Sequence, residues 1–268
     1  MNIRGATALV TGGAGGIGLA VARRLLEGRA RVVLWDNDRE ALGRAAGELS
    51  ALGPVRSATV DVTDAAAVQS EAARLAAEGW DVDLLDANAG VAFPGDLLEM
   101  EQRRLEATFR VNVEGVANCI RAFAPPMVRK GRGHVVLMAS AAALTAVPGL
   151  AAYAASKHAV IGLADSFRLE LRRRGALGVK VTVVCPGFVR TPLFAGVEAP
   201  VVLPWLTPQG LAALIADGVE RDLLYVRAPW IVRWLPLLRS VSPTFLHDRL
   251  GDWLGLTHST DPWKGRAG

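Results

Sequence analysis

Short apolar runs alternate with longer segments of helical periodicity along most of this chain. The runs are rich in Val, Leu and Ala and lie at 6–10, 31–35, 55–60, 82–86, 134–139, 179–184 and 223–226. Between them, apolar residues recur at helical spacing, for example at 18–27, 39–49, 65–78, 153–174 and 208–218. This alternation is typical of a parallel sheet that is covered by helices on both faces. The sequence therefore predicts an α/β fold with a doubly wound sheet.

The chain is organised as one folded unit with an extension. Neither a Pro-, Gly- or Ser-rich linker nor an internal repeat interrupts the first 190 residues. We therefore expect a single domain at 1–226 and a C-terminal extension at 227–268. Within the domain, the alternation degrades at 187–208, a loop rich in Pro and apolar side chains, and long loops of this kind are usually functional.

Residue composition and spacing exclude several classes of protein. The chain has only two cysteines, and none of its four histidines pairs at metal-ligand spacing, so we expect neither a disulfide framework nor a metal site. Its net charge of +4 is spread over alternating basic and acidic residues, which argues against nucleic-acid binding. An apolar run starts almost at residue 1 without a signal-peptide pattern, so we expect a cytoplasmic protein.

A glycine-rich turn, Thr-Gly-Gly-Ala-Gly-Gly-Ile-Gly at 11–18, follows the first run and opens a helix. Glycines let the backbone approach a pyrophosphate closely, and the helix N-terminus presents unpaired N–H groups to it. Asp36 ends the second run, where an acid would bind the adenosine ribose hydroxyls of a dinucleotide. Because its carboxylate would also repel the 2′-phosphate of NADP, and Asn37 supplies no cation, we expect NAD. Arg39 leaves NADP as the less favoured alternative.

Asp61 ends the third run and has two possible roles. Its side chain is placed where it could contact the adenine edge. It could equally cap the next helix, a role for which Thr63 and Asp64 compete.

Tyr153 and Lys157 lie four residues apart, a spacing that puts both side chains on one face of a helix. A phenol with a pKa near 10 is a poor base at pH 7. Lys157 and the positive nicotinamide ring of the oxidised cofactor would favour the phenolate. Ser140, just after the fifth run, could hold the substrate oxygen. These residues predict hydride transfer between nicotinamide and an alcohol or carbonyl, with Tyr153 as the acid/base.

These motifs together resemble those of the short-chain dehydrogenases/reductases over about residues 4–192. The turn at 11–18 is similar to the TGxxxGIG signature of that family, Asn88-Ala89-Gly90 to its NAG motif, and the segment at 186–191 to its PGxxxT turn. Ser140, Tyr153 and Lys157 match its serine, tyrosine and lysine, and Asn112 its fourth catalytic residue. The turn also fits the TGxxGxxG form of nucleotide-sugar epimerases, but the NAG motif and the short chain argue against those enzymes.

The resemblance implies a Rossmann-type sheet in the order 3-2-1-4-5-6-7 and a homodimer or homotetramer. It implies that Asn112 supports a water that relays protons through Lys157, and that Thr191 contacts the nicotinamide carboxamide. The catalytic residues expected on this basis are Asn112, Ser140, Tyr153 and Lys157. The residues expected to bind the cofactor are Gly12, Gly15, Gly16, Ile17, Gly18, Asp36, Asn37, Asp61, Val62, Asn88, Ala89, Gly90, Tyr153, Lys157, Pro186, Gly187, Val189 and Thr191.

Two departures from the family pattern, Ala87 and Ala139, replace a frequent Asn and a frequent Ser without removing a proposed chemical group.

Apolar side chains dominate the segments that are expected to surround the substrate. We expect Phe93, Ser140, Leu144, Val147, Phe188 and Phe194 to contact it, with further wall residues Leu150, Leu193, Val202, Leu203, Trp205 and Leu206. Such a pocket binds by apolar burial. The hypothesis is therefore a hydrophobic secondary alcohol or its ketone, of steroid, terpenoid, retinoid or long-chain type.

The extension at 227–268 carries four of the seven tryptophans, Trp230, Trp234, Trp253 and Trp263, together with several arginines. We expect it to pack on the pocket or on a neighbouring subunit, and contact with a membrane surface is the less favoured alternative.

Two other functions remain open. One is an NAD(P)-dependent 3-ketoacyl or polyketide ketoreductase, and the other is a regulator that binds NAD without turnover.

Overall fold

The computed structural model describes residues 1–194, 196–197, 204–241, 243, 245, 249, 252 and 263. Within these residues a seven-stranded sheet has the order β3-β2-β1-β4-β5-β6-β7, and every neighbouring pair is parallel. The strands are β1 (Thr7–Thr11), β2 (Arg31–Asp36), β3 (Val55–Thr59), β4 (Leu84–Ala87), β5 (Gly133–Met138), β6 (Val179–Pro186) and β7 (Tyr225–Ala228). The predicted fold class and strand order are confirmed.

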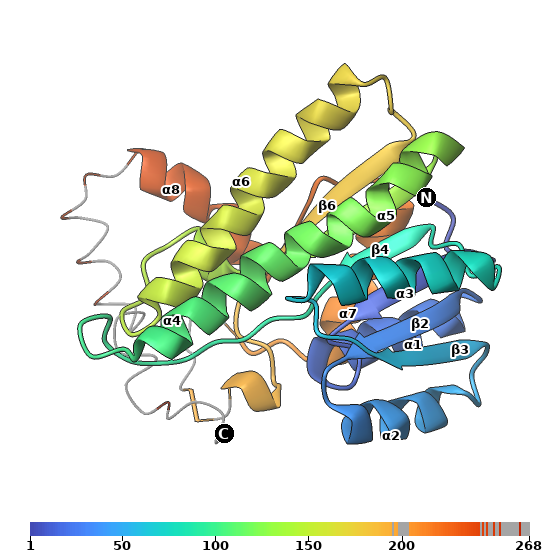
Figure 1. The fold of residues 1–268 in the computed structure, drawn as a ribbon. Helices are drawn as coiled ribbons and strands as arrows, with labels where there is room; N and C mark the ends of the chain where they lie inside the picture. Colours follow the sequence, from blue (N-terminus) through green and yellow to red (C-terminus); the bar gives the residue numbers. More distant parts are fainter. Residues whose placement is uncertain are drawn as a thin grey trace.

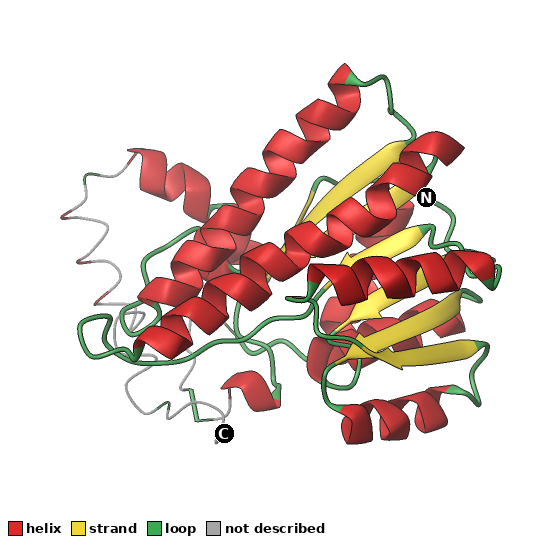
Figure 2. Cartoon of the chain, in the orientation of Figure 1, coloured by secondary structure: helices red, strands yellow, loops and turns green. Residues whose placement is uncertain are grey.

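Helices cover both faces of the sheet, so the strands lie between two helical layers (Figures 1 and 2). The near layer in Figure 1 contains α3 (Ala65–Ala77), α5 (Val116–Lys130) and α6 (Ala151–Arg173), and the far layer contains α1 (Gly16–Glu27) and α7 (Pro208–Glu220). The remaining helices are α2 (Arg39–Leu49), α4 (Gln102–Phe109) and the short α8 (Leu235–Val241). None of the helices that the structure describes has both the length and the apolar character needed to span a membrane.

Each layer encloses its own apolar core. The Trp35 and Phe123 rings pack 5.4 Å apart at a tilt of 57° in the core of the α3–α5–α6 layer, whereas Leu34 and Leu211 lie in the core of the α1–α7 layer. Strands such as β1 and β5 are buried along their whole length, because both of their faces are covered. Burial on both faces explains why the runs read as continuous rather than alternating apolar sequence.

Some bounds of the strands and of the extension differ from those predicted. The last strand was expected at 223–226 but lies at Tyr225–Ala228, because the Leu223 N–H closes the turn after α7 by donating to the Gly218 carbonyl over 2.8 Å. Arg227 and Ala228, which we expected in the extension, are therefore part of the sheet. The sequence indicated α5 less clearly, since Pro125 and Pro126 lie inside it.

One strand residue is an acid in an apolar setting. Asp86 in β4 is 1% exposed, and its neighbours in register are Val10 of β1 and Val136 of β5. Neither carboxylate oxygen has a hydrogen-bond partner in the described part of the chain. Burial raises the pKa of Asp86 to about 7.

Candidate active site

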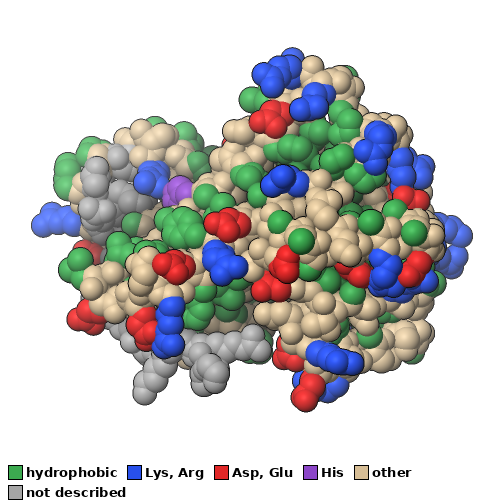
Figure 3. Space-filling model, in the orientation of Figure 1, with side chains coloured by type: hydrophobic (Ala, Val, Ile, Leu, Met, Phe, Trp, Pro, Cys, Tyr) green, Lys and Arg blue, Asp and Glu red, His purple; other side chains and the backbone are tan. Residues whose placement is uncertain are grey.

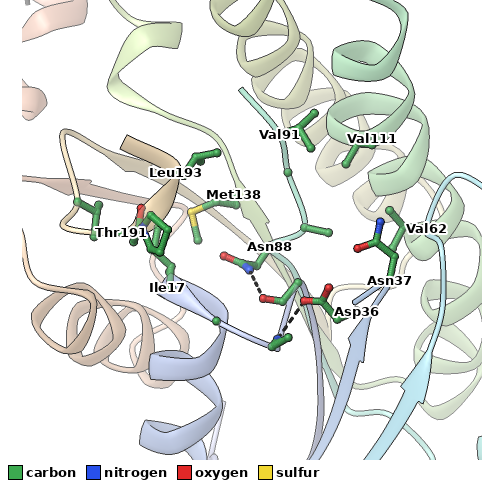
Figure 4. A pocket seen from close by; sticks show the side chains of 18 of the residues that line it. Ile17, Asp36, Asn37, Val62, Asn88, Val91, Val111, Met138, Thr191 and Leu193 are labelled. Atoms are coloured by element: carbon green, nitrogen blue, oxygen red, sulfur yellow. Dashed lines mark hydrogen bonds between the residues drawn. The ribbon is translucent and has the colours of Figure 1, made fainter. Parts of the chain in front are cut away.

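A cavity of about 310 Å³ lies at the carboxyl ends of the strands, between the turn that opens α1 and the first turn of α6. Figure 4 shows side chains from several strands and loops converging on it, among them Asp36, Asn88, Met138 and Thr191. Ligands of open α/β sheets bind at this edge of the sheet.

The glycine turn forms one end of the cavity. Gly16 has φ +56°, a backbone conformation that favours glycine. A Cβ on Gly18 would lie 2.2 Å from the Gly12 carbonyl oxygen, so only glycine lets α1 pack against the turn. Gly15 caps α1 without a side-chain hydrogen bond, and a Cβ there would meet no atom within 4 Å. The helix N-terminus is thus open toward the cavity and fits an anionic group such as a pyrophosphate.

Asp36 is held rigidly at the end of β2. Its Oδ2 accepts a hydrogen bond from the Ala14 N–H at 3.0 Å, and its Oδ1 accepts one from the Asp38 N–H at 3.1 Å. Both bonds fix the carboxylate beside the glycine turn, and the bond to Ala14 is drawn in Figure 4. The geometry fits the predicted contact with ribose hydroxyls.

The two possible roles of Asp61 are separated by the structure. Asp64 caps α3, since its Oδ1 accepts from the Ala66 and Ala67 N–H groups at 2.9 and 3.0 Å. Asp61 instead accepts from the Thr63 N–H at 2.8 Å and lines the cavity. It is therefore available to a ligand there, and the helix cap falls to Asp64.

Asn88 and Thr11 join the ends of β4 and β1. The Asn88 Nδ2 donates to the Thr11 carbonyl at 2.9 Å, and the Thr11 hydroxyl accepts from the Ala89 N–H at 3.0 Å. These bonds hold the Asn88-Ala89-Gly90 segment against the glycine turn. Thr11 was not among the expected site residues, although it belongs to the same glycine motif.

Tyr153, Ser140 and Lys157 meet at the other end of the cavity. Tyr153 and Lys157 lie one turn apart at the start of α6, and Ser140 is the second residue after β5. The Tyr153 side chain is hydrogen bonded to Ser140, and the Lys157 Nζ lies 5.7 Å from the centroid of the Tyr153 ring. The Lys157 Nζ also donates to the Met138 carbonyl at 2.7 Å. The structure thus brings together three of the four expected catalytic residues around one phenolic hydroxyl.

The pKa values of this pair differ from the sequence-based expectation. Burial raises the pKa of Tyr153 to about 12, and the hydrogen bond with Ser140 only partly opposes that shift. Burial lowers the pKa of Lys157 to about 8. Desolvation of both side chains outweighs any effect of the Lys157 charge on the Tyr153 pKa. The phenol is therefore protonated at neutral pH.

Asn112 lies in a π-helical turn (Arg110–Gly115) between α4 and α5. Its Oδ1 accepts from the Val91 N–H at 2.8 Å, and its Nδ2 donates to the Val91 carbonyl at 2.9 Å and to the Ser156 hydroxyl at 3.0 Å. Such turns often occur at functional sites. Asn112 does not line the cavity, but a Cβ on Gly90 would lie 3.2 Å from its Oδ1 and 3.4 Å from the Lys157 Nζ. Asn112 thus lies behind Gly90, on the Lys157 side of the site.

Most residues expected at the cofactor line the cavity. The exception is Gly18, which permits the close packing of α1 and does not reach the surface of the cavity. The cavity also contains residues that were not named individually among the expected catalytic, cofactor or substrate residues: Ala14, Trp35, Asp38, Ala41, Val60, Val91, Val111, Met138, Ala139 and Pro192. Their contribution depends on strand ends and loops that meet only in three dimensions.

An aromatic wall stands beside Tyr153. Phe194 meets the Tyr153 ring edge-on at 6.3 Å, and it contacts Phe188 at 6.1 Å and Trp263 at 5.4 Å. Phe188 in turn packs on Trp205 at 5.7 Å. Trp263, from the extension, is only 4% exposed. One tryptophan of the extension therefore packs into the wall of the pocket.

Only some of the residues that were expected to contact the substrate line the cavity. Phe194, Leu193 and Ser140 line the cavity, whereas Phe93, Leu144, Val147 and Phe188 do not. Phe188 lies behind Phe194, and Leu144 and Val147 pack on the core. The Phe93 ring lies 5.9 Å from the Arg104 guanidinium. Val202, Leu203 and Trp253 fall outside the described residues.

Comparison with known proteins adds independent evidence. A family described as short chain dehydrogenase matches residues 6–201. Epidermal retinol dehydrogenase 2 of Mus musculus is 32% identical over 273 residues, covering 99% of this chain and 87% of that protein. 1-Deoxy-11-beta-hydroxypentalenate dehydrogenase of Streptomyces exfoliatus is 41% identical over 233 residues, 84% of each chain. The structure of a short-chain dehydrogenase/reductase from Burkholderia phymatum in complex with NAD aligns with a TM-score of 0.81 and 30% identity, over 90% of this chain and 95% of that one.

Proposed function

Because the chain belongs to the short-chain dehydrogenase/reductase family, whose members are NAD(P)-dependent oxidoreductases acting on CH–OH groups, we propose that it uses NAD and interconverts a hydrophobic secondary alcohol and its ketone. The observation that carries the proposal is the Tyr153–Ser140 pair, which lies beside Lys157 in the same cavity as the glycine turn and Asp36.

Two features of the cavity support NAD over NADP. Asp36 presents a carboxylate next to the glycine turn, and this charge would repel a 2′-phosphate. Among the described residues that line the cavity, Lys157 is the only Lys or Arg, and its Nζ is bonded to Met138 at the far end. No cation in the described lining therefore lies next to Asp36 to bind a phosphate. The similar structure from Burkholderia phymatum contains NAD.

The residues of the chain divide the work of the reaction. Bound NAD supplies the hydride acceptor for alcohol oxidation and, in its reduced form, the hydride donor for ketone reduction. Tyr153 holds the proton that is given to the carbonyl oxygen or taken from the alcohol, and Ser140 orients both that hydroxyl and the substrate oxygen.

Lys157 and Asn112 support the proton transfer. Lys157 is placed to hold ribose hydroxyls with the donors that Met138 leaves free. When it is charged, it also favours loss of the Tyr153 proton. Asn112 fixes the backbone at Val91 with two hydrogen bonds and lies behind Gly90, on the Lys157 side of the site. A water held between these two residues would relay protons to Lys157.

Apolar character at the substrate end supports the proposed substrate class. Phe194, Leu193 and Val91 line the cavity next to the catalytic hydroxyls, and Trp263 closes the wall behind Phe194. Two of the relatives are named as dehydrogenases of retinol and of a hydroxypentalenate, and both names denote compounds with a hydroxyl group. A cytoplasmic location and a homodimer or homotetramer remain part of the proposal.

The test is nicotinamide reduction by the purified chain with NAD or NADP across apolar and short polar alcohols. Tyr153→Phe should lower kcat/KM by about 10²–10⁴, the usual size of general acid–base catalysis. Tyr225→Phe is a matched control, because Tyr225 is the only other tyrosine and its hydroxyl donates to Asp165 at 2.9 Å, outside the cavity. Higher kcat/KM for short polar alcohols, or turnover that survives in Tyr153→Phe, would refute the proposal.

Two alternatives have clear signatures in the same assay. A 3-ketoacyl or polyketide ketoreductase would prefer NADPH and acyl substrates, and Asp36 argues against that preference. A regulator that binds NAD without turnover would bind the cofactor tightly and oxidise no alcohol, and the complete set of Tyr153, Ser140 and Lys157 argues against it.

A further inference from the structure

Exposed apolar side chains gather on the segment that follows β7. Trp230 is 69% exposed, Trp234 54% and Val241 69%, and Leu237 and Phe245 are more than half exposed as well. The same segment is anchored from the other side, since Val232 and Leu235 are buried in the core of the α3–α5–α6 layer. We call these five exposed side chains, together with Arg233 and Arg239, the α8 patch.

The α8 patch has the pattern of an amphipathic surface helix. From Trp234 through Leu237 to Val241, where α8 ends, exposed apolar residues recur every three or four positions, the spacing of one helix face, and Phe245 continues that spacing in the sequence. Large apolar side chains on a water-exposed face cost free energy unless something covers them, and a contiguous group of them marks an interaction site.

Charge identifies the partner. The sequence at 227–247 contains Arg227, Arg233 and Arg239 and no Asp or Glu. Arg233 and Arg239 are both exposed, and Figure 3 shows Lys or Arg side chains beside hydrophobic ones over α8. Tryptophan next to arginine is the combination that binds the interface of an anionic bilayer. A second copy of the chain fits less well, because a two-fold contact through the patch would bring like charges together.

The patch also lies close to the active site. Pro229, the residue before Trp230, packs on Gly187, and a Cβ on Gly187 would lie 3.1 Å from the Pro229 Cδ. Gly187 lines the cofactor cavity. On α6, His158 directly follows Lys157, and its Nε2 lies 3.5 Å from Arg239 of α8.

We propose that the α8 patch docks the protein onto an anionic lipid surface with the opening of the active site close to that surface. Trp230, Trp234 and the aliphatic side chains enter the headgroup region, and Arg233 and Arg239 contact lipid phosphates. An apolar alcohol dissolved in the bilayer then reaches the enzyme without crossing water, a consequence that rests on the proposed function. The docking itself does not depend on it.

The test is flotation of the full chain with vesicles of phosphatidylcholine, with or without phosphatidylserine. We expect binding to the phosphatidylserine vesicles that weakens as salt increases. The double variant Trp230→Glu with Trp234→Glu should bind about tenfold more weakly or worse, because two aromatic groups that would enter the headgroup region are lost. Arg233→Gln with Arg239→Gln should lose most of the salt dependence.

A matched control keeps the test specific. Leu98 and Leu177 are 93% and 65% exposed and lie outside the patch, so Leu98→Glu with Leu177→Glu adds the same charge elsewhere. The proposal is wrong if the wild type stays unbound at low salt, or if the control variant loses binding as strongly as the tryptophan variant. A change of oligomeric mass in the tryptophan variant without lipid would overturn it in favour of an interface between copies.

Activity separates this proposal from the proposed function. The tryptophan variant should keep its kcat/KM on a water-soluble alcohol and lose turnover of an apolar alcohol that is supplied in vesicles. Vesicle binding without any alcohol oxidation would leave the docking surface in place and refute only the enzymatic proposal.

Discussion

Asp86 makes the stability of this protein depend on pH, and Asp86→Asn should remove that dependence. The carboxyl group lies in the central strand β4 between Val10 and Val136, and burial raises its pKa from the ordinary value of 3.8 to about 7. Between these two values the folded protein keeps the proton that the unfolded chain has released. Folding then takes up a proton, and stability falls as pH rises.

The size of the effect follows from the shift. The stabilising contribution is complete below pH 3.8 and is lost as pH rises through about 7, after which both states are ionised. The shift covers about three pH units, and each unit corresponds to about 1.4 kcal/mol, so the total is about 4 kcal/mol. About 3 kcal/mol of this falls between pH 5 and pH 8.

The assay is urea unfolding of the wild type and of Asp86→Asn at several pH values between 5 and 8. The free energy of unfolding of the wild type relative to the variant should fall by about 3 kcal/mol across that range. Burial lowers the pKa of His134 to about 4, so its contribution to stability has the opposite pH dependence and is lost as pH falls. It is present in both proteins and cancels in the difference.

A difference in unfolding free energy that is the same at pH 5 and pH 8 would refute the reasoning. Asn also leaves a polar group buried, so Asp86→Val is a second variant that removes the polar atoms. At pH 8, Asp86→Val should be more stable than the wild type. At pH 5 this gain in stability should be smaller or absent.

Three further predictions concern the site. Asp36→Ala should lower the NAD-to-NADP ratio of kcat/KM about tenfold, since one charged contact is worth about 1.5 kcal/mol or more; initial rates with both cofactors measure this. Trp263→Ala should raise KM for apolar alcohols about tenfold while kcat changes little, and Trp263→Phe should restore most of the loss, because an aromatic ring supports Phe194. kcat/KM for alcohol oxidation should rise from pH 6 to 9, because the Tyr153 phenolate that accepts the proton becomes more populated, while kcat/KM for ketone reduction should stay flat, because a phenol with a pKa of about 12 is protonated throughout that range.

Each of these has an outcome that contradicts it. An unchanged cofactor ratio in Asp36→Ala would mean that another group selects the cofactor. Loss of kcat without a change of KM in Trp263→Ala would assign Trp263 to folding rather than to the pocket wall. Parallel pH profiles in the two directions would remove Tyr153 as the titrating group.

The sheet and the cofactor end of the site could be predicted from sequence because their signals are local. Alternation of apolar runs determines the layers, and Gly16 and Gly18 are required by the turn itself. Tyr153 and Lys157 share a helix, so their spacing alone places them together.

The remaining features depend on contacts between distant segments. Nothing in the run at 82–86 distinguishes Asp86 from an acid at the end of a strand, because it is buried between Val10 of β1 and Val136 of β5, which are distant in the sequence. Trp263 packs on Phe194, which lies far away in the sequence, and no periodic pattern predicts such a contact. Phe188 and Phe194 looked equivalent in sequence, yet only Phe194 lines the cavity, since the fold of their shared loop decides which ring faces inward.

The aromatic wall has a consequence for how this enzyme could diverge. The glycine turn, Asp36 and Asp61 all lie within the first 62 residues, whereas Phe188, Phe194, Trp205 and Trp263 come from the last third of the chain. Gly187, Val189 and Thr191, which line the cofactor cavity, also lie in that last third, so only substitutions of the aromatic side chains themselves leave the residues that hold the nucleotide unaltered. A mutant library confined to these aromatic residues should therefore yield new substrate preferences while the affinity for NAD stays unchanged.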